Sequence, residues 1–300
     1  MQQYSDLNNE ILTNGEDRKH ERTGVWCRSI FSHESRYNLQ QAFPMVNQKF
    51  TPIYVTITEL LWFMSGDTNI KTLHKFNNHI WDAWADANGE CKNIYGKQWT
   101  NWEHNELQYS GDFITHSDGS ETHYGAKVLR TKHNQVEKLV EKIKTNPSDR
   151  RLIISAWNVG ELESAALPAC HSFIQFYVSP SGKLSCKLTQ RSADVPIGVP
   201  VNIASYSVMT HIIAQICGLE VGTFIHSLGD AHIYHDQFDG VKEMLSRPPI
   251  ENKAKLWINP ELKSLADFRI ENYNSLDDIK KDFKLIDYVS HPKINLPVAV

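Results

Sequence analysis

One cysteine in the chain has neighbours that could make its thiol reactive. Cys170, His171 and Ser172 come directly before the apolar stretch FIQFYV, and Arg191 ends the next stretch of similar character. If the two stretches pair as a hairpin, Arg191 comes close to Cys170, because the open ends of a hairpin meet. A guanidinium beside a thiol stabilises the thiolate, which is the nucleophilic form. Many free cysteines are simply buried, but this pattern favours covalent catalysis by Cys170.

The segment that follows has the composition of a binding loop. Residues 190–206 read QRSADVPIGVPVNIASY, which is too polar at its start for a plain strand. Arg191 and Ser192 could hold an anion, and Asp194 adds a carboxylate. The amide of Asn202 both donates and accepts hydrogen bonds, so it could read the edge of a uracil-like ring. The alternative is a surface turn between a strand and a helix.

A histidine and a tyrosine form a second polar pair. His232 and Tyr234 are two residues apart on an expected extended segment, so their side chains would face the same side. They are either a half-buried polar pair or part of a site. His232 and Asp236 have a spacing that could begin a metal site, but nothing in the sequence completes it, and we expect no metal.

Two tryptophans and a glutamate add further candidates. Trp81 and Trp84 have helical spacing, which is typical of core residues and would also suit a stacking wall for a flat heterocycle. Glu59 lies in the apolar stretch ITELLWFM. Its carboxylate either faces solvent at a helix start or is buried, and burial would raise its pKa and suit it to proton transfer.

The elements that must position these residues follow from hydrophobic periodicity. We expect helices at 58–66, 134–146, 203–217 and 236–246, strands at 151–157, 171–178, 183–189 and 222–228, and a four-residue turn at 179–182. Residues 103–126 are polar and are expected to form a surface loop or small excursion. Helices and strands mix without strict alternation and no linker divides them, which favours an α+β fold with one domain over residues 1–300.

The overall composition excludes several classes of protein. The 300 residues include 31 Lys and Arg and 35 Asp and Glu, and the resulting charge of −4 argues against a nucleic-acid binder with a large basic surface. No apolar run approaches the roughly 20 residues that span a membrane, and the polar N-terminus does not resemble a secretory signal. Five scattered cysteines without a CxxC pair favour a reducing, cytoplasmic location.

Taken together, these segments resemble the thymidylate synthase family along nearly the whole chain. The matching stretches are RTG at 22–24, ELLWFMSGDTNI at 59–70, WDAWADANG at 81–89, IYGKQW at 94–99, SDRRLIISAWNVGEL at 148–162, CHSFIQFYV at 170–178, QRSAD at 190–194, NIASY at 202–206, GDAHIY at 229–234 and PVAV at 297–300. The match lapses at 103–126. Ala169 and Val201 depart from the family, which usually has Pro and Phe at these positions.

The resemblance implies a large twisted mixed β-sheet flanked by helices, with two such sheets packed back to back in a homodimer. It also implies the reductive methylation of dUMP to dTMP. The co-substrate 5,10-methylenetetrahydrofolate supplies both the one-carbon unit and the hydride, and no metal is needed. The location would be the cytoplasm, or the host-cell cytosol for a viral enzyme.

Carried over to this sequence, the family pattern gives each nucleotide-site residue a role. Cys170 would add to C6 of uracil, and Asn202 would read the O4 and N3–H edge. His232 and Tyr234 would bind the 3′-hydroxyl of the deoxyribose. The implied phosphate ligands are Arg22, Arg191, Ser192 and, reaching across to the partner's phosphate site, Arg150 and Arg151.

The same pattern implies a folate side. Glu59 would order water and relay protons, and Tyr95 would help remove the C5 proton through water. Asp194 would contact the pterin and Lys49 the glutamate tail. The residues implied to line the pocket are Ile80, Trp81, Trp84, Gly198 and Val201, closed over by a tail that holds Ala299 and Val300.

Three alternatives remain open. In a dUMP hydroxymethylase, water rather than hydride traps the methylene and tetrahydrofolate is released. A cytidylate hydroxymethylase is disfavoured, because that branch carries Asp where this chain has Asn202. An inert homologue that only binds a nucleotide or RNA is disfavoured by the presence of Cys170, Glu59 and Tyr95.

Overall fold

A six-stranded sheet forms the centre of the molecule. The computed structural model describes residues 1–19, 24–109, 111, 113–123 and 125–298, with the backbone alone at 123 and 126. Along the sheet, the strands are β1 (Glu16–Lys19), β2 (Trp26–Asn38), β10 (Glu220–Tyr234), β9 (Lys183–Asp194), β8 (His171–Val178) and β7 (Ile153–Ser155). β9 and β10 are parallel, whereas the other neighbours are antiparallel. This mixed sheet, flanked by helices, confirms the predicted α+β class.

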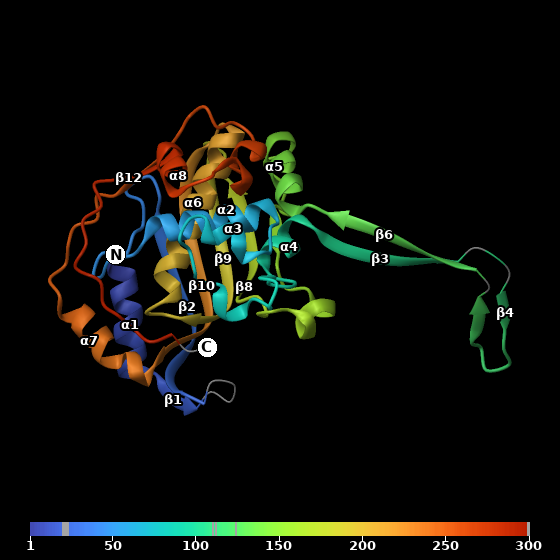
Figure 1. Cartoon of the computed structure of the whole chain (residues 1–300), viewed down its shortest axis with the longest axis horizontal. Coiled ribbons are helices and arrows are strands. Elements are labelled where there is room, and N and C mark those ends of the chain that lie inside the picture. Colours follow the sequence, from blue (N-terminus) through green and yellow to red (C-terminus); the bar gives the residue numbers. More distant parts are fainter. Residues whose placement is uncertain (20–23, 110, 112, 124, 299–300) are drawn as a thin grey trace.

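Two apolar helices cover one face of the sheet (Figure 1). α6 (Gly198–Cys217) packs on β9 and β10, and α2 (Ile53–Ser65) packs on α6. Both are apolar on nearly all sides, as expected for helices enclosed by other elements. Each ends at a glycine in the left-handed region, Gly218 at φ 67° and Gly66 at φ 74°. A residue with a Cβ is disfavoured in this conformation, so these glycines stop the helices.

The remaining helices surround this centre. They are α1 (Gln2–Asn14), α3 (Ile70–His74), α4 (Tyr95–Thr100), α5 (Gln135–Thr145), α7 (Phe238–Ser246) and α8 (Leu276–Asp282), with short 3₁₀ helices η1 (Asp82–Trp84), η2 (Val159–Ser164), η3 (His235–Gln237), η4 (Leu265–Phe268) and η5 (Ile270–Asn272). β11 (Lys255–Ile258) and β12 (Phe283–Ile286) form a separate antiparallel pair. Within the described ranges, no helix has the length and apolar character to cross a membrane.

The predicted hairpin is confirmed. β8 spans 171–178 and pairs with β9 across the turn at 179–182, where the Gly182 amide donates to the Ser179 carbonyl at 2.9 Å. β9 runs to Asp194, beyond the predicted end at 189, because β10 pairs with it as far as the His232–Asp194 register. Backbone bonds to a neighbour thus maintain a strand where the sequence becomes polar.

Several helices and strands begin or end at other residues than predicted. α2 and α6 begin at Ile53 and Gly198, about one turn before the predicted starts, and β10 spans 220–234 rather than 222–228. β7 covers only 153–155 of the predicted strand. The helix predicted at 236–246 is the turn η3 followed by α7.

The polar stretch after residue 102 forms strands rather than the expected loop. β3 (Trp102–Tyr109) pairs with β6 (Ala126–His133), and β4 (Phe113–Thr115) pairs with β5 (Glu121–His123). We call β3 and β6 together the ribbon. Figure 1 shows the ribbon projecting away from the sheet and helices. Its strands have exposed side chains on both faces, so the sequence lacks the alternation of a half-buried strand.

Candidate active site

Cys170 directly precedes β8, and its backbone amide is hydrogen-bonded to a buried tyrosine. The Cys170 amide donates to the Tyr95 hydroxyl at 2.8 Å, and the His171 amide donates to the same oxygen at 3.4 Å. The Tyr95 and His171 rings stack, with centroids 4.8 Å apart. Burial raises the pKa of Tyr95 well above its usual value, so its hydroxyl keeps its proton near neutral pH.

The structure also brings Arg191 to Cys170, as the hairpin predicted. The Arg191 amide donates to the Cys170 carbonyl at 2.9 Å. Its guanidinium donates to the carbonyls of Pro168 and Ala169 at 2.8 and 3.0 Å and lies over the Trp157 ring at 5.5 Å. The loop before the cysteine therefore fixes the charge of Arg191 next to it.

Glu59 is buried rather than exposed, which decides between the two predicted settings. Its carboxylate accepts a hydrogen bond from the Trp81 indole at 2.7 Å. Burial raises the pKa of Glu59 to about 7, although the Trp81 bond opposes the shift. A carboxyl group with this pKa can both give and take a proton near neutral pH.

An aromatic cluster surrounds Glu59. Trp81 lies within 6.1 Å, centroid to centroid, of Trp62, Phe63, Trp84 and Tyr95. Of these rings, only Trp84 is partly exposed. Trp81 is therefore a core residue, which is one of its two predicted settings, and Trp84 is at the edge where the cluster meets solvent. Contact of either ring with a folate stays a prediction.

Asn202 belongs to a chain of polar groups that the sequence analysis missed. Its side-chain oxygen accepts from Gln190 at 3.2 Å, and the Gln190 oxygen bonds His226 Nε2 at 2.8 Å. All three side chains are buried. Burial lowers the pKa of His226 to about 3 and that of neighbouring His171 to about 4, so both rings are neutral at pH 7. The sequence signal that could have revealed this chain is a polar residue, Gln190 or His226, at a position of a strand where its neighbours predict burial.

The ends of the parallel strands bring three more candidates together. His232 on β10 is in register with Asp194 on β9, and the His232 and Tyr234 rings are 5.1 Å apart, so this pair shares one side as predicted. His232 Nδ1 lies 3.1 Å from Asp230 rather than bonding Asp236. Burial lowers the pKa of His232 and raises that of Asp194.

A glutamine links this corner to the C-terminal segment. The Gln237 side chain donates to Asp194 at 3.1 Å and to the Pro297 carbonyl at 3.0 Å. Lys49 is close enough to Asp194 to feel its charge, and burial lowers the Lys49 pKa to about 8. Gly198 starts α6 next to Asn202: a Cβ on it would be 3.6 Å from the Asn202 oxygen. The C-terminal segment at Pro297 is thus linked through Gln237 to Asp194, the residue predicted to contact the pterin.

Other predicted residues are not gathered at Cys170 within this chain. Arg151 pairs with Asp149 at 3.0 Å and is 78% exposed, and Arg150 precedes it. Ile80 is exposed, and Ser192 and Val201 are half-buried. Arg22 and Ala299 lie outside the described residues.

Arg151 lines a cavity at the base of the ribbon. The cavity measures about 320 Å³ and is lined by Trp102, His133, Gln135, Lys138, Leu139, Lys142, Arg151, Ile153 and Ser155. Cys170, Glu59 and Tyr95 do not line it. Lys138, Lys142 and Arg151 make the cavity basic. Because its lining shares none of the three residues named above, it is separate from the cluster at Cys170.

Comparison with known families agrees with the fold. A family model described as thymidylate synthase matches residues 2–300. The match covers essentially the whole chain, including every element that carries the groups described above. This protein belongs to the thymidylate synthase family.

Proposed function

We propose that the protein converts dUMP to dTMP by reductive methylation, with 5,10-methylenetetrahydrofolate as co-substrate. Family membership already makes it an enzyme of dUMP and folate chemistry. The choice of hydride over water is supported by the folate side, where Gln237 joins Asp194 to the C-terminal segment at the Pro297 carbonyl. The covalent step, which both reactions share, is supported by the arrangement at Cys170. Its backbone is bonded to Tyr95, Arg191 is fixed beside it, and the buried Glu59 is part of the adjoining aromatic cluster.

The first step is nucleophilic addition to the base. The Cys170 thiolate adds to C6 of uracil, which makes C5 nucleophilic. Arg191 favours the thiolate and also binds the phosphate, because the two bonds to Pro168 and Ala169 use only part of its five N–H donors. Ser192 follows Arg191 on β9 and adds a hydroxyl to this phosphate site.

Asn202 selects the base. Its oxygen can accept from uracil N3–H as well as from Gln190, and its NH₂ donates to O4. The Gln190–His226 bond holds Gln190 in place, so Gln190 is a positioning residue for the amide. His232 and Tyr234, at the end of β10, bind the sugar.

Glu59 and Tyr95 handle protons. Glu59, with a pKa raised to about 7 by burial, exchanges protons with water at the folate side. The Tyr95 hydroxyl accepts two backbone amides and keeps its own proton for a water at C5. Each group has a fixed position because each is bonded to a neighbour in the buried cluster.

The residues present fit a bound folate. Exposed Ile80 and half-buried Trp84 offer apolar surface for a flat ring, and Asp194 offers a carboxylate for its polar edge. Lys49 offers a cation for the glutamate tail, and Gly198 and Val201 begin the helix on this side. When bound, the folate supplies the one-carbon unit and the hydride.

We also propose that the enzyme is a homodimer with shared active sites. Along β9, residues facing α6 are buried, whereas alternate residues on the opposite face remain partly exposed. On β8 that opposite face presents Phe173 and Tyr177 to solvent. A second sheet packed there would cover these rings, and exposed Arg150 and Arg151 would reach the partner's phosphate site. A cytoplasmic location remains a prediction.

Subunit mixing tests the shared site. Arg151→Ala and Cys170→Ser should each be inactive alone and regain activity when mixed and allowed to exchange subunits. One site of each heterodimer then combines an intact Cys170 with an intact Arg151. Inactive mixtures in which mass spectrometry confirms heterodimers would show that Arg151 does not act across the interface.

Product analysis tests the reaction. Mass spectrometry of the nucleotide should show dTMP, and absorbance should show one dihydrofolate for each dTMP formed. The second candidate is the dUMP hydroxymethylase, which is favoured by Val201: a smaller side chain than the usual Phe leaves more room for water beside the folate. Formation of 5-hydroxymethyl-dUMP with tetrahydrofolate would establish that activity instead.

A further inference from the structure

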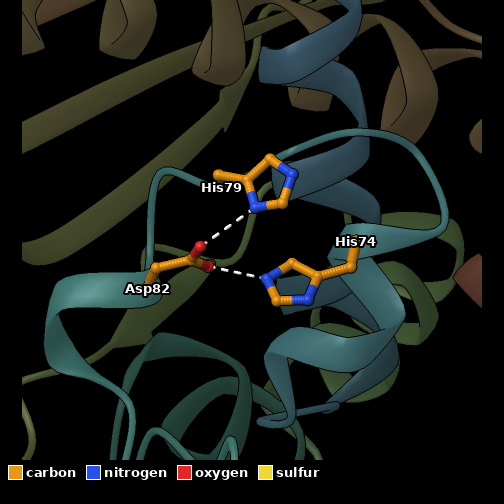
Figure 2. A group of neighbouring side chains, drawn as sticks. All are labelled: His74, His79 and Asp82. Atoms are coloured by element: carbon orange, nitrogen blue, oxygen red, sulfur yellow. Dashed lines mark hydrogen bonds and ion pairs between the residues drawn. The ribbon is translucent and has the colours of Figure 1, made fainter.

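Two imidazoles and one carboxylate converge on the surface, and none of them takes part in the hydrogen bonds described around Cys170. His74 ends α3, His79 lies in the following turn, and Asp82 begins η1. His74 Nε2 is 2.7 Å from one Asp82 oxygen, and His79 Nδ1 is 2.9 Å from the other. Figure 2 shows both rings directed at this carboxylate. One ligand atom from each residue lies within 4.8 Å of the other two.

Each of the three residues follows a buried residue in the chain. Leu73 precedes His74, Asn78 precedes His79, and Trp81 precedes Asp82, and all three are at most 5% exposed. The surface groups therefore extend from fixed points of the backbone. Pre-organisation of this kind reduces the entropy lost when ligands are ordered around an ion.

Backbone bonds and one buried side chain tie the intervening turn together. The Asn78 amide donates to the Leu73 carbonyl at 3.2 Å, and the Asp82 amide donates to the His79 carbonyl at 3.3 Å. The Asn78 side chain donates to Val55 and Thr58 of α2 at 3.0 Å each. The turn is thus attached to the helix that carries Glu59.

We propose that His74, His79 and Asp82 bind a divalent transition-metal ion, with zinc as the best fit, and that water completes its coordination. Imidazole nitrogen and carboxylate oxygen suit Zn²⁺ and its neighbours better than Mg²⁺ or Ca²⁺, which prefer oxygen ligands. Bonds of about 2.0–2.2 Å place tetrahedral ligands about 3.3 Å apart. The two nitrogen–oxygen separations, 2.7 and 2.9 Å, are shorter than this, so the side chains must rotate slightly apart to admit an ion.

The ion replaces the hydrogen bonds that now join the rings to Asp82. Each imidazole binds through the nitrogen that faces the carboxylate, after moving its proton to the other ring nitrogen. The His74 hydrogen bond lowers the pKa of Asp82, which keeps its carboxylate ionised.

The bound ion would join the end of α3 to η1 across residues 75–81. This segment includes Ile80, which is exposed, and Trp81, which is buried and whose indole is bonded to Glu59. The ion therefore stiffens one wall of the proposed folate pocket without touching reacting atoms. That consequence rests on the proposed function, whereas the metal site itself does not.

Metal titration of the purified full chain tests the site. Calorimetry with Zn²⁺ and absorbance with Co²⁺ should give one ion per chain for the wild type. His74→Ala and His79→Ala should each weaken binding about tenfold or more. His116→Ala is the matched control, because His116 is an exposed histidine that bonds Thr122 beyond the ribbon. It should bind like the wild type.

Three readouts make the result decisive. The Co²⁺ spectrum must lack the intense near-ultraviolet absorption of thiolate ligands, which separates this site from the free cysteines. Zn²⁺ should slow hydrogen exchange of residues 75–81 in the wild type but not in His79→Ala. Equal affinity in the wild type and both ligand variants, or no binding by the wild type, would overturn the proposal whatever reaction the enzyme catalyses.

Discussion

The surroundings of Cys170 and the ribbon are built in opposite ways. Around the cysteine, Tyr95 and Glu59 are buried and hydrogen-bonded to groups from distant parts of the chain. In the ribbon, Leu107 and Val128 face each other across the strands and are each 55% exposed. Isolated two-stranded hairpins are marginally stable in water. Long-range contacts therefore concentrate where chemistry is proposed, and the ribbon depends mainly on its own backbone bonds.

The strongest test of this difference is removal of the thiol. Cys170→Ser should reduce turnover by roughly a thousandfold or more, because a serine hydroxyl is a poor nucleophile near neutral pH. Calorimetry should still detect dUMP binding, since Arg191 and Asn202 remain. Cys217→Ser is the matched control and should keep its activity. Near-normal turnover by Cys170→Ser would remove this residue from the mechanism.

Next in size is a pH effect on stability from buried Glu59. Its pKa is raised from 4.5 to about 7 by burial, so between these values the folded state holds a proton that the unfolded chain has released. The free energy of unfolding therefore falls as pH rises through this window, by about 3 kcal/mol. Urea titrations at pH 5 and 8 give the free energy of unfolding of the wild type and of Glu59→Gln. The decrease between the two pH values should be larger in the wild type.

A companion variant checks the cause of this effect. The indole bond of Trp81 lowers the Glu59 pKa, so Trp81→Phe should move the loss of stability to higher pH. If wild type and Glu59→Gln lose the same stability between pH 5 and 8, Glu59 does not titrate in this window. The group would then be as unaffected by its surroundings as a side chain on the ribbon.

Base recognition should give a smaller change. Asn202→Asp should shift preference from dUMP toward dCMP, because a protonated carboxyl can donate to cytosine N3 and accept from its amino group. An unpaired buried polar group costs about 1–3 kcal/mol, which corresponds to a preference change of roughly 5- to 150-fold. The ratio of kcat/KM for the two nucleotides measures it, and an unchanged ratio would show that Asn202 does not read the base.

Shortening the ribbon should have the least effect. Glu103 and Lys132 are cross-strand partners, so an Asn-Gly turn can join them in place of residues 104–131. We expect turnover within about twofold of the wild type and a Tm within about 2 °C, because few contacts outside the ribbon are lost. A tenfold loss of turnover would mean that the ribbon supports the site or the dimer.

Local signals in the sequence explain which elements could be predicted. The β8–β9 hairpin, the helix α5 with its buried Val136, Leu139, Val140 and Ile143, and the glycine that ends α6 each depend on residues close together in the chain. The extension of β9 beyond residue 189 depends on β10, which is distant in sequence, and could not be read from the polar segment alone. The ribbon was missed because neither of its faces is buried.

The same distinction applies to the site. The hairpin brought Arg191 to Cys170, a carboxylate within an apolar stretch indicated Glu59, and family resemblance supplied Tyr95. Gln190 was missed, because its role depends on contacts with Asn202 and with a histidine on β10. Residue type identifies a candidate group, whereas its hydrogen-bond partner becomes known only from the packing of separate elements.

The parallel pairing of β9 and β10 also bears on the order in which the molecule folds. These strands cannot meet through a tight turn, because parallel neighbours need a crossover connection, which here is α6. Contacts between residues far apart in sequence slow folding, since loop-closure entropy is lost before the contacts form. Asp194 and His232 lie at the ends of these strands. A nascent chain that stops before β10 therefore lacks His232 and Tyr234 of the proposed nucleotide site, even though Cys170 and Arg191 have already been synthesised.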